Sequence, residues 1–383
     1  MKFPKSLKQK LETRKVNNAL RKLPVSNNLV DFSSNDYLGF SKSEQIFNQT
    51  HQLLVDRKLK QNGATGSRLL SGNHILYQET EALISNFHQT ESALIFNSGY
   101  DANVGFFSCV PQRNDIIFFD ELSHASIRDG IQMSLAKSYK FKHNDLADLE
   151  IRLQKCHIER SRDVAIYIVT ESVFSMDGDS PNLVALVSLC EKYNALLVID
   201  EAHALGVFGK KGEGLVQQLG FQDRVFARIM TFGKGLGCHG AAILGSINLK
   251  EYLVNFARSF IYTTGLSPHS VATINVAYTF LQFKTNELQK LQRNIKFFKS
   301  EVHNQKLDSF FVESDSAIHC AVIKGNTKVK QIASDLHQKG FDVKPILSPT
   351  VPEGQERLRI CLHSFNTEEE MKGIVKFLKE LID

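Results

Sequence analysis

A lysine enclosed by glycines is the first group in this sequence that could do chemistry. Residues 231–240 read TFGKGLGCHG, with a glycine on either side of Lys234. The glycines after the lysine spell G-x-G-x-x-G, the pattern of a dinucleotide-binding loop. Such a loop must lead into a helix, whose first amides bind the pyrophosphate, but the residues after Gly240 read AAILGS and are typical of a strand. The stretch therefore favours a loop that presents the Lys234 amine, with a solvated lysine in a tight turn as the plain alternative.

A second candidate follows an apolar run that ends in the sequence D-E-A-H. The run ALLVID (195–200) ends at Asp200, and His203 completes the motif. Taken alone, D-E-A-H after such a run is typical of the magnesium-binding strand of a nucleic-acid-dependent ATPase. That function also requires a phosphate loop of the form G-x-x-x-x-G-K-[ST], which occurs nowhere in the sequence. An ATPase or another nucleotide-binding module is therefore kept only as an alternative.

Lys234 and Asp200 together match the needs of an aldehyde cofactor such as pyridoxal phosphate. The cofactor needs a lysine amine to bond its aldehyde and a carboxylate to keep its pyridine nitrogen protonated. Asp200 ends a strand, at the edge where α/β sheets bind ligands. A phosphate could bind the backbone N–H groups of Gly99 and Tyr100, which follow an apolar run and begin a helical pattern. A plain helix cap would explain Ser98 and Gly99 equally well.

These candidates depend on a sheet of parallel strands, which the apolar runs predict. Short runs rich in β-branched, aliphatic and aromatic residues occur at 93–96, 115–120, 164–170, 195–200, 228–232 and 240–246. Most are separated by stretches with apolar residues at three- and four-residue spacing, such as 183–193. Strands that are apolar throughout and alternate with helices are typical of a mostly parallel sheet covered on both faces. We therefore predict a doubly wound α/β domain.

A long helical pattern at 286–305 interrupts this alternation. Beyond it we expect a second, smaller α/β domain. Its expected parts are a strand at 317–324, a helix near 327–339, a segment through 341–346, a strand at 357–363 and a final helix that begins near Thr367.

The N-terminal segment completes the predicted organisation. The sequence MKFPKSLKQKLETRK has a basic start with no apolar run behind it, so it predicts a short amphipathic helix rather than a signal peptide. We expect an N-terminal helix and arm at 1–45, a large cofactor-binding domain at 46–280 and a small C-terminal domain at 281–383.

The composition bounds the function more loosely. In 383 residues the net charge is +5, and the basic residues are spread along the chain, which favours small anionic ligands over nucleic acid. The six cysteines form no C-x-x-C pair and no cysteine–histidine cluster at metal-ligand spacing. We therefore expect reduced thiols in a cytoplasmic protein, with no metal site. The longest apolar runs are too short to span a membrane.

Ordered blocks along nearly the whole chain resemble the fold-type I pyridoxal-phosphate enzymes and, among them, the α-oxoamine synthases. The blocks are DFSSNDYLGF (31–40), GATGSRLLSGNH (63–74), FNSGYDANVG (96–105), DELSHASIRDG (120–130), ESVFSMDGDS (171–180), IDEAHALGVFG (199–209), TFGKGLG (231–237) and PTVPEGQERLRI (349–360). The resemblance implies a homodimer with shared active sites. It also implies a decarboxylative condensation of an amino acid with an acyl thioester of coenzyme A or of a carrier protein.

Within this family, the blocks are most similar to the member that joins L-alanine to a pimeloyl thioester in biotin synthesis. Glycine C-acetyltransferase, serine palmitoyltransferase and 5-aminolevulinate synthase share the cofactor residues and stay as alternatives. The sequence separates these members poorly, because one methyl group of a substrate changes its binding by only ~1–3 kcal/mol.

The resemblance also assigns roles around the cofactor. Lys234 would bond the aldehyde and move the α-proton, and Asp200 would pair with the pyridine nitrogen. His203 and Ser175 would contact the phenolic oxygen. His124 would stack on the ring, although a histidine at a helix start is more often part of the cap. The phosphate would be held by Gly99, Tyr100 and Thr231, with Thr263 and Thr264 reaching it from the other subunit.

A smaller set of positions would bind the substrates. Arg359 would take the carboxylate of the amino acid through a bidentate pair, which lysine could not reproduce. As an alternative, Arg357 or Arg359 is a surface charge at a strand edge. Arg21 would meet the far carboxylate of the acyl chain, and Asn35 and Thr350 also match substrate-binding positions.

The chain departs from the family pattern at two positions. Tyr77 stands where some members have a histidine, and Leu347 stands where some have an arginine. The leucine puts the contact with the far end of the acyl chain in question.

Overall fold

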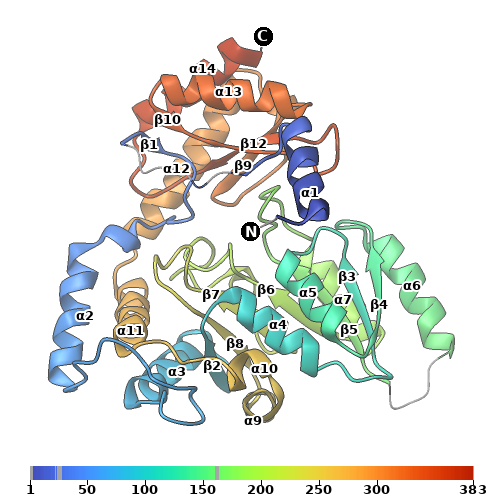
Figure 1. Cartoon of the computed structure of the whole chain (residues 1–383), viewed down its shortest axis with the longest axis vertical. Coiled ribbons are helices and arrows are strands. Elements are labelled where there is room, and N and C mark those ends of the chain that lie inside the picture. The colour runs from blue at the N-terminus through green and yellow to red at the C-terminus, as the bar shows by residue number, and fades with distance from the viewer. Residues whose placement is uncertain (1–2, 22, 24–27, 160–163, 383) are drawn as a thin grey trace. The chain divides into compact units, whose positions relative to one another are not determined.

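The computed structural model describes residues 3–21, 23, 28–159 and 164–382, which form two compact units. The larger unit comprises Asn35–Ser175 and Ser180–Lys290, and the smaller comprises Met1–Ser34, Met176–Asp179 and Leu291–Asp383 (Figure 1). The predicted domain limits stay a prediction, because a compact unit need not be a domain that folds on its own.

The larger unit is built on a seven-stranded sheet. In spatial order its strands are β2 (Ser92–Phe96), β8 (Ala241–Gly245), β7 (Ala227–Thr231), β6 (Leu196–Asp200), β5 (Ile166–Glu171), β3 (Ile116–Asp120) and β4 (Lys137–Phe141). The strands from β7 to β4 are parallel, whereas β8 runs antiparallel to both β2 and β7. The loop 232–240 is too short for a crossover, so β7 and β8 can pair only in this way. The predicted doubly wound, mostly parallel sheet is confirmed, with β8 as a reversed strand.

Helices cover both faces of this sheet. Successive residues of a strand point to opposite faces, so neighbouring residues pack beneath different helices. On β5 and β6, Val169 and Val198 join the core beneath α4 (Gly99–Cys109), α5 (Ala125–Met133) and α9 (Ile247–Phe256). Their neighbours Ile168 and Ile199 join the core beneath α6 (Leu146–Glu159) and α7 (Leu183–Lys192). The larger unit also holds α2 (Glu44–Asp56), α3 (Ile75–Phe87), α8 (Leu215–Gln218), α10 (Arg258–Ile261), α11 (Pro268–Phe283) and the 3₁₀ helix Phe40–Lys42.

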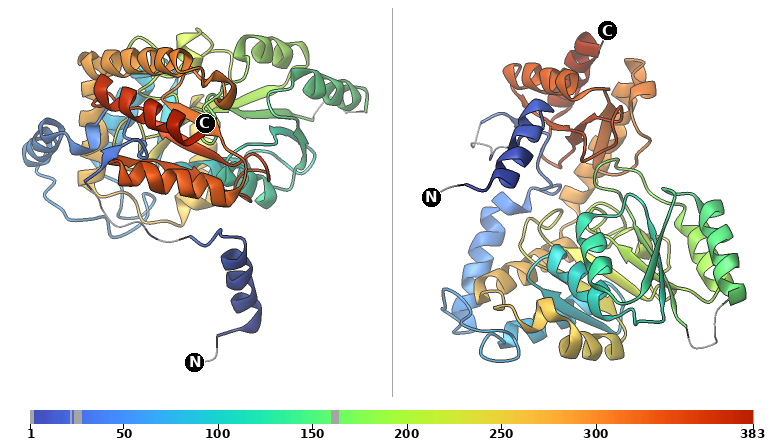
Figure 2. Two further views of the ribbon diagram at one scale, coloured as in Figure 1. Left: turned by 90° about the horizontal axis from the view of Figure 1, so that it is seen from above. Right: turned by 45° about the vertical axis from the view of Figure 1, so that its right-hand side comes forward.

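The smaller unit has an antiparallel sheet in the order β11 (Lys344–Ile346), β12 (Arg357–Cys361) and β9 (Ile318–Val322). A two-residue strand, β1 (Val30–Asp31), pairs in parallel with β10 (Phe341–Asp342). The helices α13 (Asn326–Gln338) and α14 (Glu368–Ile382) pack against each other (Figure 2). The remaining elements are α1 (Lys5–Val16), α12 (Asn286–Asn304), which begins in the larger unit, and the 3₁₀ helix Asp308–Phe310.

The N-terminal helix is present as expected, but α1 buries none of its side chains. Within the described ranges, no helix is both long and apolar enough to cross a membrane.

Candidate active site

Polar side chains gather where three neighbouring parallel strands of the larger sheet end. Glu171, Asp200 and Thr231 are the last residues of β5, β6 and β7, which lie side by side (Figure 1). Glu171 and Asp200 are paired in register. Because the carboxyl ends of parallel strands meet at one edge of the sheet, these residues mark the edge at which α/β sheets bind ligands.

The Lys234 amine lies in the loop that follows β7 and contacts a histidine from the loop that follows β6. Lys234 Nζ is 2.7 Å from His203 Nε2. The other ring nitrogen, His203 Nδ1, is 2.7 Å from the hydroxyl of the fully buried Tyr37, which donates to Asn35 Oδ1 at 3.2 Å. With the phenol donating to Asn35, its oxygen accepts from Nδ1–H, which leaves Nε2 as the acceptor for the amine. The half-buried lysine is therefore held by the fold and is not a solvated turn residue.

Asp200 is a buried carboxylate whose two oxygens both have N–H donors. Asp200 Oδ1 accepts the backbone N–H of Ala202 at 2.9 Å, and Oδ2 accepts the side-chain amide of Asn103 at 2.8 Å. Asn103 also donates to Ser126 Oγ at 3.0 Å. Two donors stabilise a buried negative charge, so the carboxylate is prepared to face a cation.

His124 is the N-cap of α5, as the alternative from the sequence had it. Its Nδ1 accepts the backbone N–H of Ser126 at 3.2 Å and lies 2.7 Å from Ser126 Oγ. Its own backbone N–H donates to Glu171 Oε1 at 2.7 Å. Burial lowers the pKa of His124, with the Asp200 charge opposing and the Lys234 charge adding to the shift. Because the imidazole caps the helix, its ring has a fixed orientation, and the predicted stacking on a cofactor stays a prediction.

The start of α4 offers an anion site beside Thr231. Ser98 is the N-cap and accepts the backbone N–H of Asp101 at 3.1 Å, so the cap interpretation of Ser98 is right. A Cβ atom at Gly99 would lie 2.3 Å from Thr231 Oγ1, so only glycine fits there. The first amides of α4 and the Thr231 hydroxyl therefore lie together, and helix N-termini attract phosphate. The phenol of Tyr100 donates to Asp129 Oδ2 at 2.7 Å, so only the Tyr100 backbone is available for that role.

Thr263 and Thr264 lie beside the segment that leads into α4 of their own chain. The side-chain amide of Asn97 donates to Thr263 Oγ1 at 3.0 Å and to the Thr264 carbonyl at 2.7 Å. Their contact with a phosphate across a dimer stays a prediction.

Ser175 follows β5 and is the last residue of the first segment of the larger unit.

The predicted substrate residues Arg21, Thr350 and Arg359 belong to the smaller unit. The guanidinium of Arg21 donates to Thr350 Oγ1 at 3.4 Å, so the structure brings these two together. Arg359 lies in β12, the central strand of the three-stranded sheet, and is buried. Arg357 is also buried and pairs with Asp177. Neither arginine is the surface charge at a strand edge that the alternative supposed.

The two departures from the family pattern have structural explanations. Tyr77 is buried, and the Arg68 guanidinium lies 3.8 Å from the centre of its ring. Burial raises the pKa of Tyr77 to about 12 against the opposing charge of Arg68, so it stays a neutral core residue that donates to the Leu266 carbonyl. Leu347 accepts the backbone N–H of Thr350 at 2.8 Å and thus shapes the turn that carries this threonine.

Four residues of the site were not singled out from the sequence: Tyr37, Asn103, Ser126 and Glu171. All four fall inside sequence blocks that carry the family resemblance, and Glu171 also directly follows the apolar run 164–170. A glutamate at the carboxyl end of a predicted parallel strand is a signal that could have identified it. The contacts of Tyr37 with His203 and of Asn103 with Asp200 join segments far apart in the chain, so the sequence contains no local sign of them.

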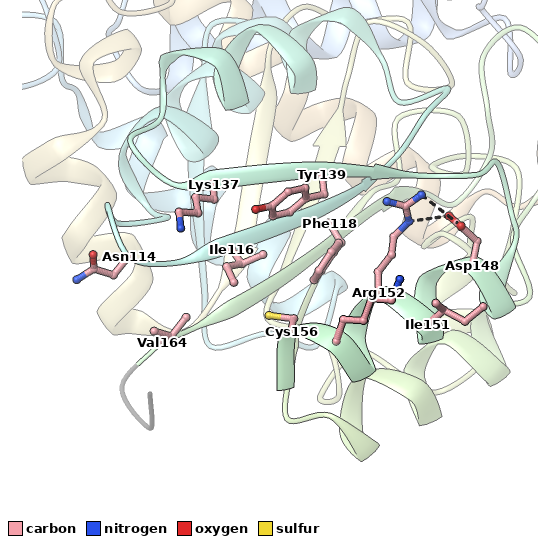
Figure 3. Close-up of a pocket in the computed structure, with 11 residues that line it drawn as sticks. Asn114, Ile116, Phe118, Lys137, Tyr139, Asp148, Ile151, Arg152, Cys156 and Val164 are labelled. Atoms are coloured by element: carbon pink, nitrogen blue, oxygen red, sulfur yellow. Dashed lines mark hydrogen bonds and ion pairs between the residues drawn. The ribbon is translucent and has the colours of Figure 1, made fainter. Parts of the chain in front are cut away.

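A cavity of about 500 Å³ elsewhere in the larger unit is separate from this site (Figure 3). It lies between α6 and the strands β3 and β4, of which β4 is the edge strand, and Figure 3 shows the ion pair of Arg152 and Asp148 along its wall. Lys137 and Ile116, the first residues of β4 and β3, also line it. It therefore opens near the amino ends of the strands, and none of the predicted site residues lines it.

Comparison with known proteins decides the family. The model of the protein family described as "Aminotransferase class I and II" matches residues 27–378. The chain belongs to this family. It is 40% identical to an 8-amino-7-oxononanoate synthase of Emericella nidulans over 97% of this chain and 94% of the relative. It is 38% identical to a putative 8-amino-7-oxononanoate synthase of Halalkalibacterium halodurans over 92% of this chain and 87% of the relative.

Solved structures of family members share the fold. An 8-amino-7-oxononanoate synthase from Francisella tularensis has a TM-score of 0.77 at 27% identity, covering 93% of this chain and 98% of that one. A serine palmitoyltransferase from S. paucimobilis has a TM-score of 0.88 at 23% identity, covering 98% and 96%. The predicted fold-type I architecture is confirmed, as is the resemblance to the α-oxoamine synthases, which are pyridoxal-phosphate-dependent acyltransferases. The alternative of an ATPase module is wrong.

The residues of the site fit pyridoxal phosphate by their chemistry. Lys234 supplies a primary amine, and Asp200 supplies a buried carboxylate with both oxygens held. Gly99 lies so close to Thr231 that a Cβ atom at Gly99 would clash with the threonine side chain. The first backbone amides of α4 therefore lie beside the Thr231 hydroxyl. An aldehyde, a pyridine nitrogen and a phosphate thus each have a matching group.

Proposed function

We propose that this enzyme condenses L-alanine with a pimeloyl thioester, with loss of carbon dioxide, to form 8-amino-7-oxononanoate for biotin synthesis. The names of the relatives at 38–40% identity support this choice of substrates. The observation that carries the chemistry is the 2.7 Å contact between Lys234 Nζ and His203 Nε2. It places a primary amine next to a base in a loop at the ligand-binding edge of the sheet.

Lys234 is proposed to bond the cofactor and to move the α-proton of the amino acid. Pyridoxal phosphate, when bound, draws electrons from the α-carbon and so acidifies its hydrogen. For Lys234 to accept that proton it must be an uncharged amine at that moment. His203 Nε2 orients the amine as a hydrogen-bond acceptor, and Tyr37 and Asn35 hold the imidazole in the tautomer that leaves Nε2 free to accept.

Asp200 and His124 are proposed to hold the ring of the cofactor. Asp200 offers a negative charge to a protonated pyridine nitrogen, and its two N–H donors fix the direction of its oxygens. His124 is proposed to stack on the ring face, with its orientation fixed by the cap of α5. Ser175 and His203 are proposed to contact the phenolic oxygen.

The phosphate is proposed to bind the backbone of Gly99 and Tyr100 and the hydroxyl of Thr231. Thr263 and Thr264 are proposed to complete this site from the second subunit of a homodimer. The six cysteines are all free thiols, which suits the cytoplasm that we propose as the location.

The carboxylates of the two substrates are proposed to bind arginines of the smaller unit. Arg359 is proposed to pair with the carboxylate of alanine, since a guanidinium binds a carboxylate in a bidentate manner. Arg21 is proposed to pair with the distal carboxylate of the pimeloyl group, assisted by the Thr350 hydroxyl. Asn35 is proposed to contribute to substrate binding next to Tyr37.

A substrate panel tests this proposal. Alanine, glycine and serine are each offered with pimeloyl, acetyl, succinyl and palmitoyl thioesters, and the product is identified by its mass. We expect the highest kcat/KM for alanine with a pimeloyl thioester. A preference for glycine with acetyl-CoA, or for serine with palmitoyl-CoA, would instead assign the enzyme to another α-oxoamine synthase activity.

A further inference from the structure

Glu171 is a buried carboxyl group to which none of the proposed roles gives a function. It ends β5 in register with Asp200 at the end of β6, and both side chains are buried. Two ionised carboxylates on paired residues of neighbouring strands in a buried site repel each other, which favours a proton on one of them.

The hydrogen bonds around the pair indicate which carboxyl group holds the proton. Asp200 receives N–H donors on both oxygens, from Ala202 and Asn103. Glu171 Oε1 accepts the backbone N–H of His124 at 2.7 Å. Since each donor stabilises the ionised form, the negative charge is more favourable on Asp200. Burial, and then the charge of Asp200, raise the pKa of Glu171 to about 8, although Lys234 opposes the shift.

The other charged groups that face Glu171 do not reverse this preference. Lys234, after β7, supplies a positive charge, and Asp120, at the end of β3, supplies a negative one. Burial lowers the pKa of His124, which favours its uncharged form. Asp120 is partly compensated by the ring of His143, whose Nδ1 lies 2.9 Å from its carboxylate.

We propose that Glu171 is a positioning residue that works in its protonated form. It accepts the backbone N–H of His124 and so fixes the start of α5, and it leaves Asp200 as the ionised member of the pair. The two carboxyl groups are further joined through a chain of side chains: His124 contacts Ser126, Ser126 accepts from Asn103, and Asn103 donates to Asp200. Ionisation of Glu171 adds a further negative charge to those of Asp200 and Asp120 at the strand ends and disturbs the placement of both His124 and Asp200.

Infrared difference spectroscopy of the cofactor-loaded enzyme tests the protonation state directly. The carbonyl stretch of a protonated carboxyl group is recorded for the wild type, for Glu171→Gln and for the control Glu150→Gln, whose surface carboxylate pairs with Lys192. At pH 6 we expect the band of one protonated glutamate to be lost in Glu171→Gln and kept in Glu150→Gln. In the wild type this band should disappear with a midpoint near pH 8. An unchanged band in Glu171→Gln would overturn the proposal.

The pH dependence of α-proton exchange on alanine separates positioning from mere stability. In the wild type, exchange should fall as the pH rises above about 8, and Glu171→Gln should lose this alkaline fall. The same alkaline fall in wild type and variant would count against the proposal. If Glu171→Gln does not fold, wild type labelled with ¹³C-glutamate is used instead. Absence of a label-shifted protonated band at pH 6, or a midpoint near 7, the value to which burial raises the pKa of Glu201, would then contradict it.

Discussion

The hydroxyl of Tyr37 lies 2.7 Å from His203 Nδ1, on the side of the imidazole opposite the Lys234 amine. Tyr37 precedes His203 by 166 positions and is fully buried. A phenol from the start of the larger unit therefore fixes the tautomer and orientation of the imidazole that contacts the Lys234 amine. In a neutral imidazole one ring nitrogen donates a hydrogen bond and the other accepts one. The partner of Nδ1 therefore determines the role of Nε2.

Tyr37→Phe should slow catalysis without unfolding the protein. The substitution keeps the buried ring and removes one hydrogen bond, worth about 0.5–1.5 kcal/mol, so kcat should fall by about 2- to 10-fold. Tyr278→Phe is the matched control, since Tyr278 is equally buried and its hydroxyl lies 3.0 Å from His88 Nε2. The control should lower the free energy of unfolding by a similar amount but leave kcat unchanged. Equal effects of the two variants on kcat would show that Tyr37 acts only through stability.

Asp200→Asn should bind the cofactor but exchange the α-proton of alanine about 10²–10³-fold more slowly. An amide cannot hold a protonated pyridine nitrogen, and loss of one charge-stabilising group in an active site has this magnitude. Deuterium exchange into alanine measures the step without the thioester. Asp115→Asn is the control, because Asp115 is a buried carboxylate that accepts backbone N–H groups just before β3. Near-normal exchange in Asp200→Asn would make Asp200 a structural strand-end residue.

Arg21→Ala should discriminate between charged and uncharged acyl chains. A charge-assisted hydrogen bond of ~1.5–3 kcal/mol predicts a loss of about one to two powers of ten in kcat/KM for pimeloyl thioesters. An uncharged acyl thioester of equal length should lose little. Arg57→Ala, a surface residue paired with Glu79, serves as the control. If charged and uncharged chains suffer alike, Arg21 does not bind the distal carboxylate.

His319 should make the stability of the protein depend on pH. Burial lowers the pKa of His319 to about 3 from 6.5, so between these values the unfolded chain binds a proton that the folded chain does not. Stability is therefore lost as the pH falls below about 6.5. Between pH 7 and pH 5, wild type should lose about 2 kcal/mol more free energy of unfolding than His319→Phe.

Urea unfolding at the two pH values checks this difference. His303→Gln, which removes an exposed histidine, should behave like the wild type. Identical pH dependence in wild type and His319→Phe would mean that His319 is protonated in the folded protein.

Much of the fold could be predicted because its strands are apolar throughout. The six predicted runs 93–96, 115–120, 164–170, 195–200, 228–232 and 240–246 each overlap a strand of the larger sheet. The edge strand β4 was missed, since KSYKF is mostly exposed and lacks the apolar run of the others. Edge strands carry charged side chains to avoid pairing with other chains, which removes the usual signal.

Candidate site residues could be proposed from the sequence where the residue type itself suggests the chemistry, but not where two distant segments meet. Lys234 and Asp200 were proposed from residue type and from their place after apolar runs. Tyr37 and Asn103 act only through contacts with His203 and Asp200, and these contacts depend on how the chain folds back on itself. His124 shows the reverse case: its capping role could be inferred from local sequence.

The central claim is that Lys234 is the residue that bonds the cofactor. Borohydride reduction of the purified, cofactor-loaded enzyme fixes that bond permanently, and digestion followed by mass spectrometry then locates the modified peptide. The structure predicts modification of the peptide that contains Lys234, and no modification of that peptide in a folded Lys234→Ala variant. A cofactor fixed to any other lysine, or the same labelling in Lys234→Ala, would contradict the proposed site.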